Sequence, residues 1–178
     1  MEGIVVGDPQ NETTVMGSVI SKEHQGKVES YIDLGIEEGG VVLTGGKACE
    51  APVQGVPASA AFLRPTVFEG LSHEARTARE EIFGPVVTLH SFQTEEEAIA
   101  IANATQYGLA GSVWTGDVER GHAFAQRLET GIVWVNTWLN RDLRTPFGGV
   151  KDSGVGREGG DWSMNFFSEL TNICVQQP

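Results

Sequence analysis

The sequence predicts an α/β fold with a mostly parallel sheet and helices on both of its faces. Two observations lead to this prediction. Segments with helical spacing of apolar residues alternate with short Val-rich segments, and such alternation favours right-handed crossovers between parallel strands. In addition, residues 131–136 form a nearly continuous apolar run, which is typical of a strand covered on both faces.

Length and charge limit the class of protein. The 178 residues with 40% hydrophobic content are sufficient for one domain with a sizeable core. A formal net charge of −12 argues against a nucleic-acid or anionic-membrane partner, because both bind clustered Lys and Arg. The chain begins without a basic targeting segment, and its apolar stretches are short. We therefore expect a cytoplasmic protein that does not bind membranes.

In the first half of the chain, Ser21 is a suitable N-cap for a helix that stops at Gly39-Gly40. The apolar residues of this helix recur at helical spacing and comprise Val28, Tyr31, Ile32 and Ile36. Residues 41–46 read as a short buried strand. Residues 62–68 contain Pro65, which predicts a sheet edge or an irregular strand. Residues 86–90 read as the next strand.

In the second half, Thr94 and Glu97 form a capping box for a helix, and Asp117 caps another. The first helix is expected to bury Ala98, Ile101 and Ala102, and the second Val118, Gly121, Ala125 and Leu128. Apolar segments at 109–114 and 131–136 read as strands, and residues 170–175 are a final strand candidate.

The stretch GVGREG at 154–159 matches the GxGxxG dinucleotide fingerprint by letter. That fingerprint requires a strand before it and a βαβ unit of about 30 residues. No apolar run precedes Gly154, and only 19 residues follow Gly159. We therefore expect a glycine-rich turn into a last helix.

Two stretches could carry chemistry. The first, EEIFGPV at 80–86, joins two carboxylates, an aromatic ring and a Gly-Pro turn at the start of a strand. A plainer interpretation is also open, in which Glu80 and Glu81 are a solvated pair and Phe83 caps the core.

The second stretch, residues 136–149, follows a buried strand at the edge where open α/β sheets form their ligand crevices. Arg141 and Arg144 suit a carboxylate ligand, and Trp138 and Phe147 could line a pocket. Alternatively, the two arginines pair with Asp142 or another surface acid.

Cysteine chemistry is sparse. Cys49 and Cys174 are the two cysteines, and neither has CxxC or Cys/His spacing. This pattern argues against a disulfide framework, and we expect no metal site.

The motifs EEIFGPV, GLAGSVWTGD, GIVWVN, TPFGGVKDSGVGREGG and ELTNICV resemble, in order and spacing, the C-terminal part of NAD(P)-dependent aldehyde dehydrogenases. The resemblance covers essentially the whole chain. The stretch WLNRDLRTPFGG is most similar to the branch that oxidises aminomuconic and hydroxymuconic semialdehydes.

This resemblance implies roles for individual residues. Glu81 would hydrogen-bond the nicotinamide ribose, and Phe83 would pack against the nicotinamide of NAD or NADP. Phe147 would line the aldehyde pocket. Arg141, or as second choice Arg144, would hold the carboxylate of a semialdehyde substrate. GVGREG would be the turn into the final helix, with glycines for close backbone packing.

The family's nucleophilic cysteine, oxyanion asparagine, general-base glutamate and cofactor domain would all precede Met1. Cys49 lies in a loop without the nucleophile motif and Cys174 in the terminal strand, so neither replaces the nucleophile. We therefore expect an inactive C-terminal fragment with no catalytic residue and no bound cofactor of its own. Residues 1–170 would be part of the catalytic domain.

Residues 171–178 would be a strand for subunit contacts, and exposed apolar surface would favour a homo-oligomer. A different class of function also stays open, in which the chain is a noncatalytic α/β assembly or binding module derived from this family.

Overall fold

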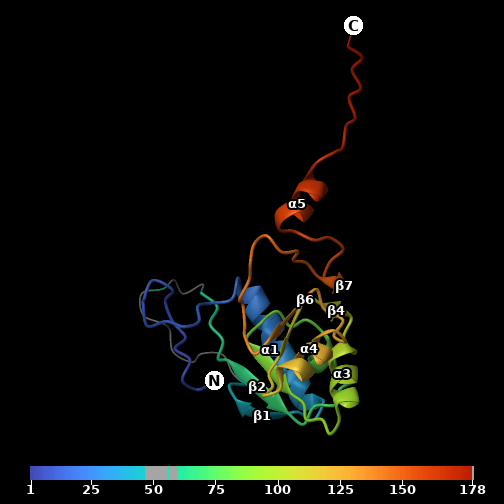
Figure 1. Cartoon of the computed structure of the whole chain (residues 1–178). Helices are drawn as coiled ribbons and strands as arrows, with labels where there is room; N and C mark the ends of the chain where they lie inside the picture. Colours follow the sequence, from blue (N-terminus) through green and yellow to red (C-terminus); the bar gives the residue numbers. More distant parts are fainter. Residues whose placement is uncertain (47–55, 57–59, 178) are drawn as a thin grey trace. The chain divides into compact units, whose positions relative to one another are not determined.

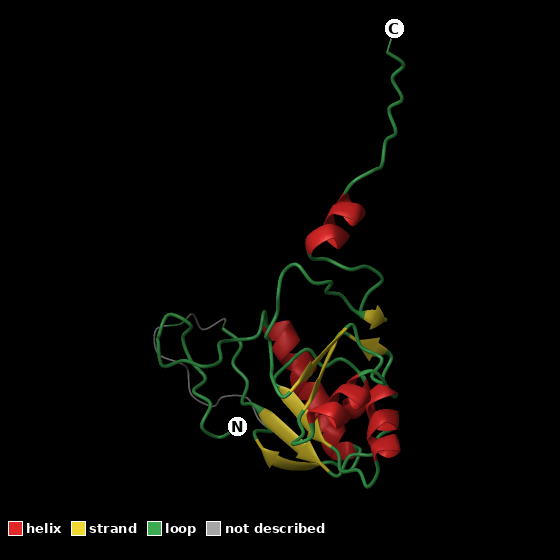
Figure 2. Ribbon diagram, viewed as in Figure 1, coloured by secondary structure: helices red, strands yellow, loops and turns green. Residues whose placement is uncertain are grey.

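The structure is a computed structural model that describes residues 1–46, 56 and 60–177. Two compact units divide the chain, Met1–Phe92 and Gln93–Pro178 (Figure 1). Helices and strands are interspersed along the chain (Figure 2). Two four-residue parallel ladders and two shorter antiparallel pairings connect the strands. The predicted α/β class is therefore confirmed.

The first unit is a helix packed on a three-stranded sheet. Its elements are α1 (Lys22–Glu37), β1 (Val41–Thr44), β2 (Thr66–Glu69), α2 (Arg76–Arg79) and β3 (Val86–Leu89). The strand order is β1-β2-β3, antiparallel between β1 and β2 and parallel between β2 and β3. The Ser21 side chain accepts a hydrogen bond from the backbone N–H of His24. The predicted N-cap of α1 is thus confirmed.

The core of this unit joins α1 to the sheet and to the segment before β3. Its buried members are Val28, Ile32, Leu63, Phe68, Leu71, Ala75 and Ile82. Gly35 lets α1 approach the sheet, because a Cβ there would lie 2.9 Å from the Phe68 ring. Burial of this set stabilises the unit by the transfer of apolar surface out of water.

The prediction of a sheet edge around Pro65 is wrong. Strand β2 lies in the centre of the sheet and begins at Thr66, and its pairing with β1 shifts register between Val42 and Thr44. Pro65 stands one residue before the strand, so its missing N–H removes no bond from the ladder. The expectation that residues 41–46 are buried is also wrong, because Val41 and Leu43 on one face of β1 are exposed.

The described residues of the second unit form seven elements. They are α3 (Glu95–Asn103), β4 (Tyr107–Gly108), β5 (Ala110–Val113), α4 (Val118–Ala125), β6 (Ile132–Val135), β7 (Val150–Lys151) and α5 (Gly160–Phe167). Strands β5 and β6 pair in parallel, and β4 pairs with β7 antiparallel. The two-residue strands β4 and β7 have no counterpart among the predicted elements, since two residues show no periodicity.

The predicted caps of the second unit are confirmed. Thr94 accepts from the N–H of Glu97, and Asp117 accepts from the N–H of Arg120. The apolar faces are only partly as expected: α3 buries Ala98 and Ile99. Helix α4 buries Gly121 alone and ends before Leu128.

The C-terminal segment differs from its prediction. The turn at 154–159 leads into α5 as expected, and a Cβ on Gly159 would lie 2.2 Å from the Thr145 carbonyl oxygen. Residues 170–175 form no strand, and Leu170 is 97% exposed. The described tail runs away from α5 as an irregular chain (Figure 2). A strand needs a hydrogen-bonding neighbour, and the described residues supply none there.

Candidate active site

Alternate residues of segment 80–84 point into and out of the first unit. Ile82 is 8% exposed and belongs to the core. Gly84 also faces inward, because a Cβ there would lie 2.6 Å from a methyl of Val28. Between them Phe83 is 72% exposed, and Glu81 is exposed as well. The core therefore presents Glu81 and Phe83 to the surface, and Phe83 does not cap the core.

The two adjacent glutamates have different surroundings. Glu80 accepts a 2.5 Å hydrogen bond from the Tyr31 hydroxyl and bonds of 2.8 and 3.0 Å from the Arg76 guanidinium. The bonds from Arg76, followed by that from Tyr31, lower the pKa of Glu80 to about 2. The Glu80 carboxylate is thus held by Tyr31 and Arg76, whereas the carboxylate of the neighbouring Glu81 lies at the surface.

Phe83 has an unusual backbone. Its φ is 57°, a left-handed value that costs a bulky residue on the order of 1–3 kcal/mol. The Phe83 carbonyl oxygen lies 2.7 Å from His24 Nε2, and the two rings meet edge to face with centroids 6.0 Å apart. Such strain is retained where the surroundings fix a residue, and it is frequent at ligand sites.

In the second unit, hydrogen bonds fix the loop that follows β6. Asn136 has a φ of 55°, and its side-chain amide exchanges two 2.8 Å hydrogen bonds with the Thr115 backbone. The buried Trp134 donates from Nε1 to the Asn140 carbonyl at 2.8 Å. Trp138 is exposed, with its ring centroid 4.8 Å from that of Trp134. These bonds shape a loop that presents Trp138.

The guanidinium of Arg141 lies over the ring of Phe147 further along this loop. The guanidinium carbon is 3.9 Å from the centroid of the Phe147 ring, within cation–π range. Nη2 donates to the Glu158 carboxylate at 2.8 Å, and Phe147 and Glu158 exchange backbone hydrogen bonds of 2.8 and 2.7 Å. The Nε of Arg141 is buried without a hydrogen-bond partner among the described residues. Phe147 and Glu158 thus hold this guanidinium in place.

Arg144 has a different environment. Its side chain is 87% exposed and pairs with Asp142 in a local fork, with Nε 2.9 Å from one carboxylate oxygen. This pairing lowers the pKa of Asp142 and raises the pKa of Arg144. The local ion pairs considered as the plainer interpretation are therefore present for both arginines, but Arg141 is also packed on an aromatic ring.

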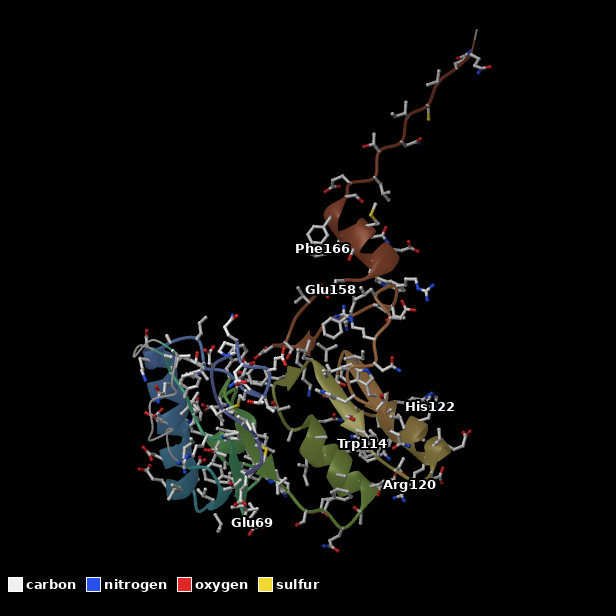
Figure 3. The ribbon with its side chains drawn as sticks, turned by 90° about the vertical axis from the view of Figure 1, so that its left-hand side faces the viewer. Glu69, Trp114, Arg120, His122, Glu158 and Phe166 are labelled. Atoms are coloured by element: carbon white, nitrogen blue, oxygen red, sulfur yellow. The ribbon has the colours of Figure 1, made fainter. Side chains whose placement is uncertain are left out.

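A pocket of about 380 Å³ lies beside this loop in the second unit. Its lining includes Phe147, Arg157, Glu158 and, on α5, Phe166 and Phe167; Figure 3 labels Glu158 and Phe166. Glu158 was not predicted as a partner of Arg141. It lies inside the glycine-rich GVGREG, and 16 residues separate it from Arg141 along the chain.

Other chemistry finds little support in residues 1–46, 56 and 60–177. There is no group of three or more His, Cys, Asp or Glu residues placed to hold a metal ion. Cys174 is exposed and reduced in the irregular tail, and Cys49 lies outside the described residues. None of the described helices is long and apolar enough to cross a membrane.

Comparison with known proteins places the chain in a family. Residues 1–173 match the model of the aldehyde dehydrogenase family. The chain belongs to this family. The resemblance found in the sequence motifs is thereby confirmed.

Individual aldehyde dehydrogenases show the range of relatives. The 2-hydroxymuconic semialdehyde dehydrogenase of Pseudomonas sp. (strain CF600) is 47% identical over 98% of this chain and 36% of its own length. A 2-aminomuconic 6-semialdehyde dehydrogenase of Pseudomonas sp. is also 47% identical, over 99% and 35%. The Mycobacterium tuberculosis aldehyde dehydrogenase complexed with NAD+ superposes with a TM-score of 0.87 at 42% identity, over 94% of this chain and 34% of that one. The chain thus spans about a third of the length of these relatives.

Proposed function

We propose that this chain contributes cofactor-facing and substrate-facing residues to the NAD-dependent oxidation of a carboxylate-bearing semialdehyde to a carboxylic acid. The observation that carries the proposal is the guanidinium of Arg141, which Phe147 and Glu158 hold in place. A planar, oriented guanidinium suits a carboxylate. The muconic semialdehyde dehydrogenases that this chain resembles act, by their names, on substrates of this class.

On the cofactor side, Glu81 and Phe83 fit a nicotinamide nucleoside. The Glu81 carboxylate is exposed and can accept hydrogen bonds from ribose hydroxyls. The exposed ring of Phe83 offers a flat apolar face to a planar ring. When bound, NAD supplies the hydride acceptor for the oxidation. The protein residues orient it and keep water from one of its faces.

On the substrate side, we propose that Arg141 binds the carboxylate of the substrate while Phe147 and Trp138 contact its carbon chain. Nε of Arg141 is buried and Nη2 already donates to Glu158, so a ligand would bind Nη1 and the remaining N–H of Nη2. Arg144 is the second choice, because its fork is already filled by Asp142.

We further propose that the 178 residues do not oxidise aldehydes by themselves. Aldehyde dehydrogenation of this type requires a positioned thiolate nucleophile, and the exposed Cys174 lies in an irregular tail. Residues 1–170 would then be part of a catalytic domain, and 171–178 would pair with another copy of the chain. The exposed side chains of Leu170, Ile173 and Val175 support pairing, and a monomeric mass in light scattering at micromolar concentration would contradict it.

A chimera tests the function. The 178 residues replace the matching third of the Pseudomonas sp. (strain CF600) relative, with the parent enzyme as control. We expect the chimera to form NADH with a carboxylate-bearing semialdehyde and the 178 residues alone to form none. A chimera with native-like circular dichroism but no NADH formation would refute the proposal and favour a noncatalytic assembly module.

A further inference from the structure

One face of α1 grips the segment that carries Glu81 and Phe83. The gripping residues occur at positions 24, 27, 28 and 31, the spacing of neighbours on one helical face. They contact segment 80–84 in four ways, which are the bond of His24 to the Phe83 carbonyl, the bond of Lys27 to the Glu81 carbonyl, the contact of Val28 with Gly84 and the bond of Tyr31 to Glu80.

Two of these contacts act on the backbone beside the exposed residues. His24 Nε2 lies 2.7 Å from the Phe83 oxygen, and Lys27 Nζ donates to the Glu81 oxygen at 3.3 Å. A carbonyl oxygen only accepts, so Nε2 of His24 must carry a proton in this contact. The shorter bond is made to the very residue whose φ is 57°. His24 is therefore placed to fix the strained peptide of Phe83.

We propose that His24 is a positioning residue for cofactor binding, which acts by holding Phe83 in its left-handed conformation with the ring directed outward. This inference rests on the proposed role of Phe83 against the nicotinamide. Without the bond from His24, Phe83 can relax to a negative φ, and the ring then leaves its orientation. The buried neighbours Ile82 and Gly84 keep the segment in place, so orientation is lost without unfolding.

The first experiment uses the chain as it is and follows Phe83 by NMR. The Cα and Cβ shifts of Phe83 report its backbone conformation, and imidazole ¹⁵N shifts report whether Nε2 of His24 is protonated. We expect His24→Ala to move the Phe83 shifts toward values for negative φ. His24→Gln, which keeps an N–H donor of similar reach, should restore them, and Asp33→Ala at an exposed position of the same helix should leave them unchanged.

The second experiment measures NADH formation by the chimera. His24→Ala should raise KM for NAD by about threefold to tenfold, the worth of one hydrogen bond, with KM for the aldehyde unchanged and with rescue by His24→Gln. Unchanged Phe83 shifts in His24→Ala, or equal changes in both KM values, would overturn the inference. If the unsubstituted chimera is inactive, the proposed function fails, and the NMR comparison alone decides whether His24 positions Phe83.

Discussion

Segment 80–84 of the first unit and loop 136–147 of the second are held by different means. The first is anchored by the side chain of Ile82, which is buried in the core, and by contacts with one face of α1. The second is fixed by side chains that bond to its own neighbourhood, such as Arg141 with Glu158 and Arg144 with Asp142. A segment tied to the core can change little, whereas a loop tied by local ion pairs can change residue by residue.

This difference matches the proposed division of labour. A cofactor is the same for every substrate, so the residues that face it gain from rigid support. A substrate-facing loop must differ between enzymes with different aldehydes, and loops on a fixed scaffold tolerate such change. The following predictions test the contrast, beginning with the largest expected effect.

Removal of the buried Ile82 side chain should cause the largest loss of stability. Ile82→Ala is expected to lower the free energy of unfolding by about 3 kcal/mol, because it leaves a cavity in the core. The matched change in the loop, Leu143→Ala at a 74% exposed side chain, should stay within about 0.5 kcal/mol. Urea unfolding of both variants measures the difference, and similar losses would show that the two segments are held alike.

The two arginines of the loop should separate in kinetics. In the chimera, Arg141→Ala is expected to raise KM for a carboxylate-bearing semialdehyde by about tenfold to hundredfold, through loss of a charge-assisted contact. KM for a neutral aldehyde should change little. Arg144→Ala, which removes an exposed arginine, should change either KM less than about threefold. Equal effects of Arg141→Ala on both aldehydes would remove the reason to assign a carboxylate substrate.

Removal of the Asn136 side-chain amide at the start of the loop should have a smaller effect on stability. Asn136→Ala removes two hydrogen bonds to Thr115 and places alanine at a φ of 55°. We expect a loss of about 1–2 kcal/mol in the free energy of unfolding. Asn140→Ala keeps the backbone carbonyl that Trp134 uses and serves as control. A loss as large in Asn140→Ala would argue against this role of the Asn136 amide.

The smallest expected effect is a pH dependence at the anchored segment. The folded pKa of Glu80 is about 2 against an ordinary 4.5, so its contribution to stability is complete above pH 4.5 and is lost as the pH falls toward 2. Glu80→Gln should flatten the stability profile in this acidic range. Urea titrations between these pH values measure the slope of the unfolding free energy against pH. If Glu80 were solvated, Glu80→Gln would leave this slope unchanged.

The fold was predictable where local chemistry decides it. Ser21, Thr94 and Asp117 each accept the expected backbone hydrogen bond, because a cap depends on residues within one turn. The position of Pro65 was not predictable, since one residue of displacement decides whether a proline lies inside a ladder. The terminal segment at 170–175 forms no strand within the chain, because strand formation depends on a neighbour that the apolar pattern does not reveal.

For the candidate site, the sequence predicted which residues are involved but not how they contact one another. The motifs named Glu81 and Phe83, but the grip of α1 joins residues 59 positions apart, such as His24 and Phe83. The pairing of Arg141 with Glu158 likewise arises from a backbone bridge between Phe147 and Glu158. Contacts between distant positions of one chain leave no periodic signal in a single sequence.

The buried side chain of Ile82 links the stability of the core to the position of the exposed residues on either side of it. The Ile82 side chain belongs to the core, while the two flanking side chains face the solvent. We therefore expect that loosening of the interior on warming displaces the exposed ring before the unit melts as a whole. In the chimera, affinity for NAD should then decline at temperatures below the melting transition, and the aliphatic residue at position 82 would set how far below.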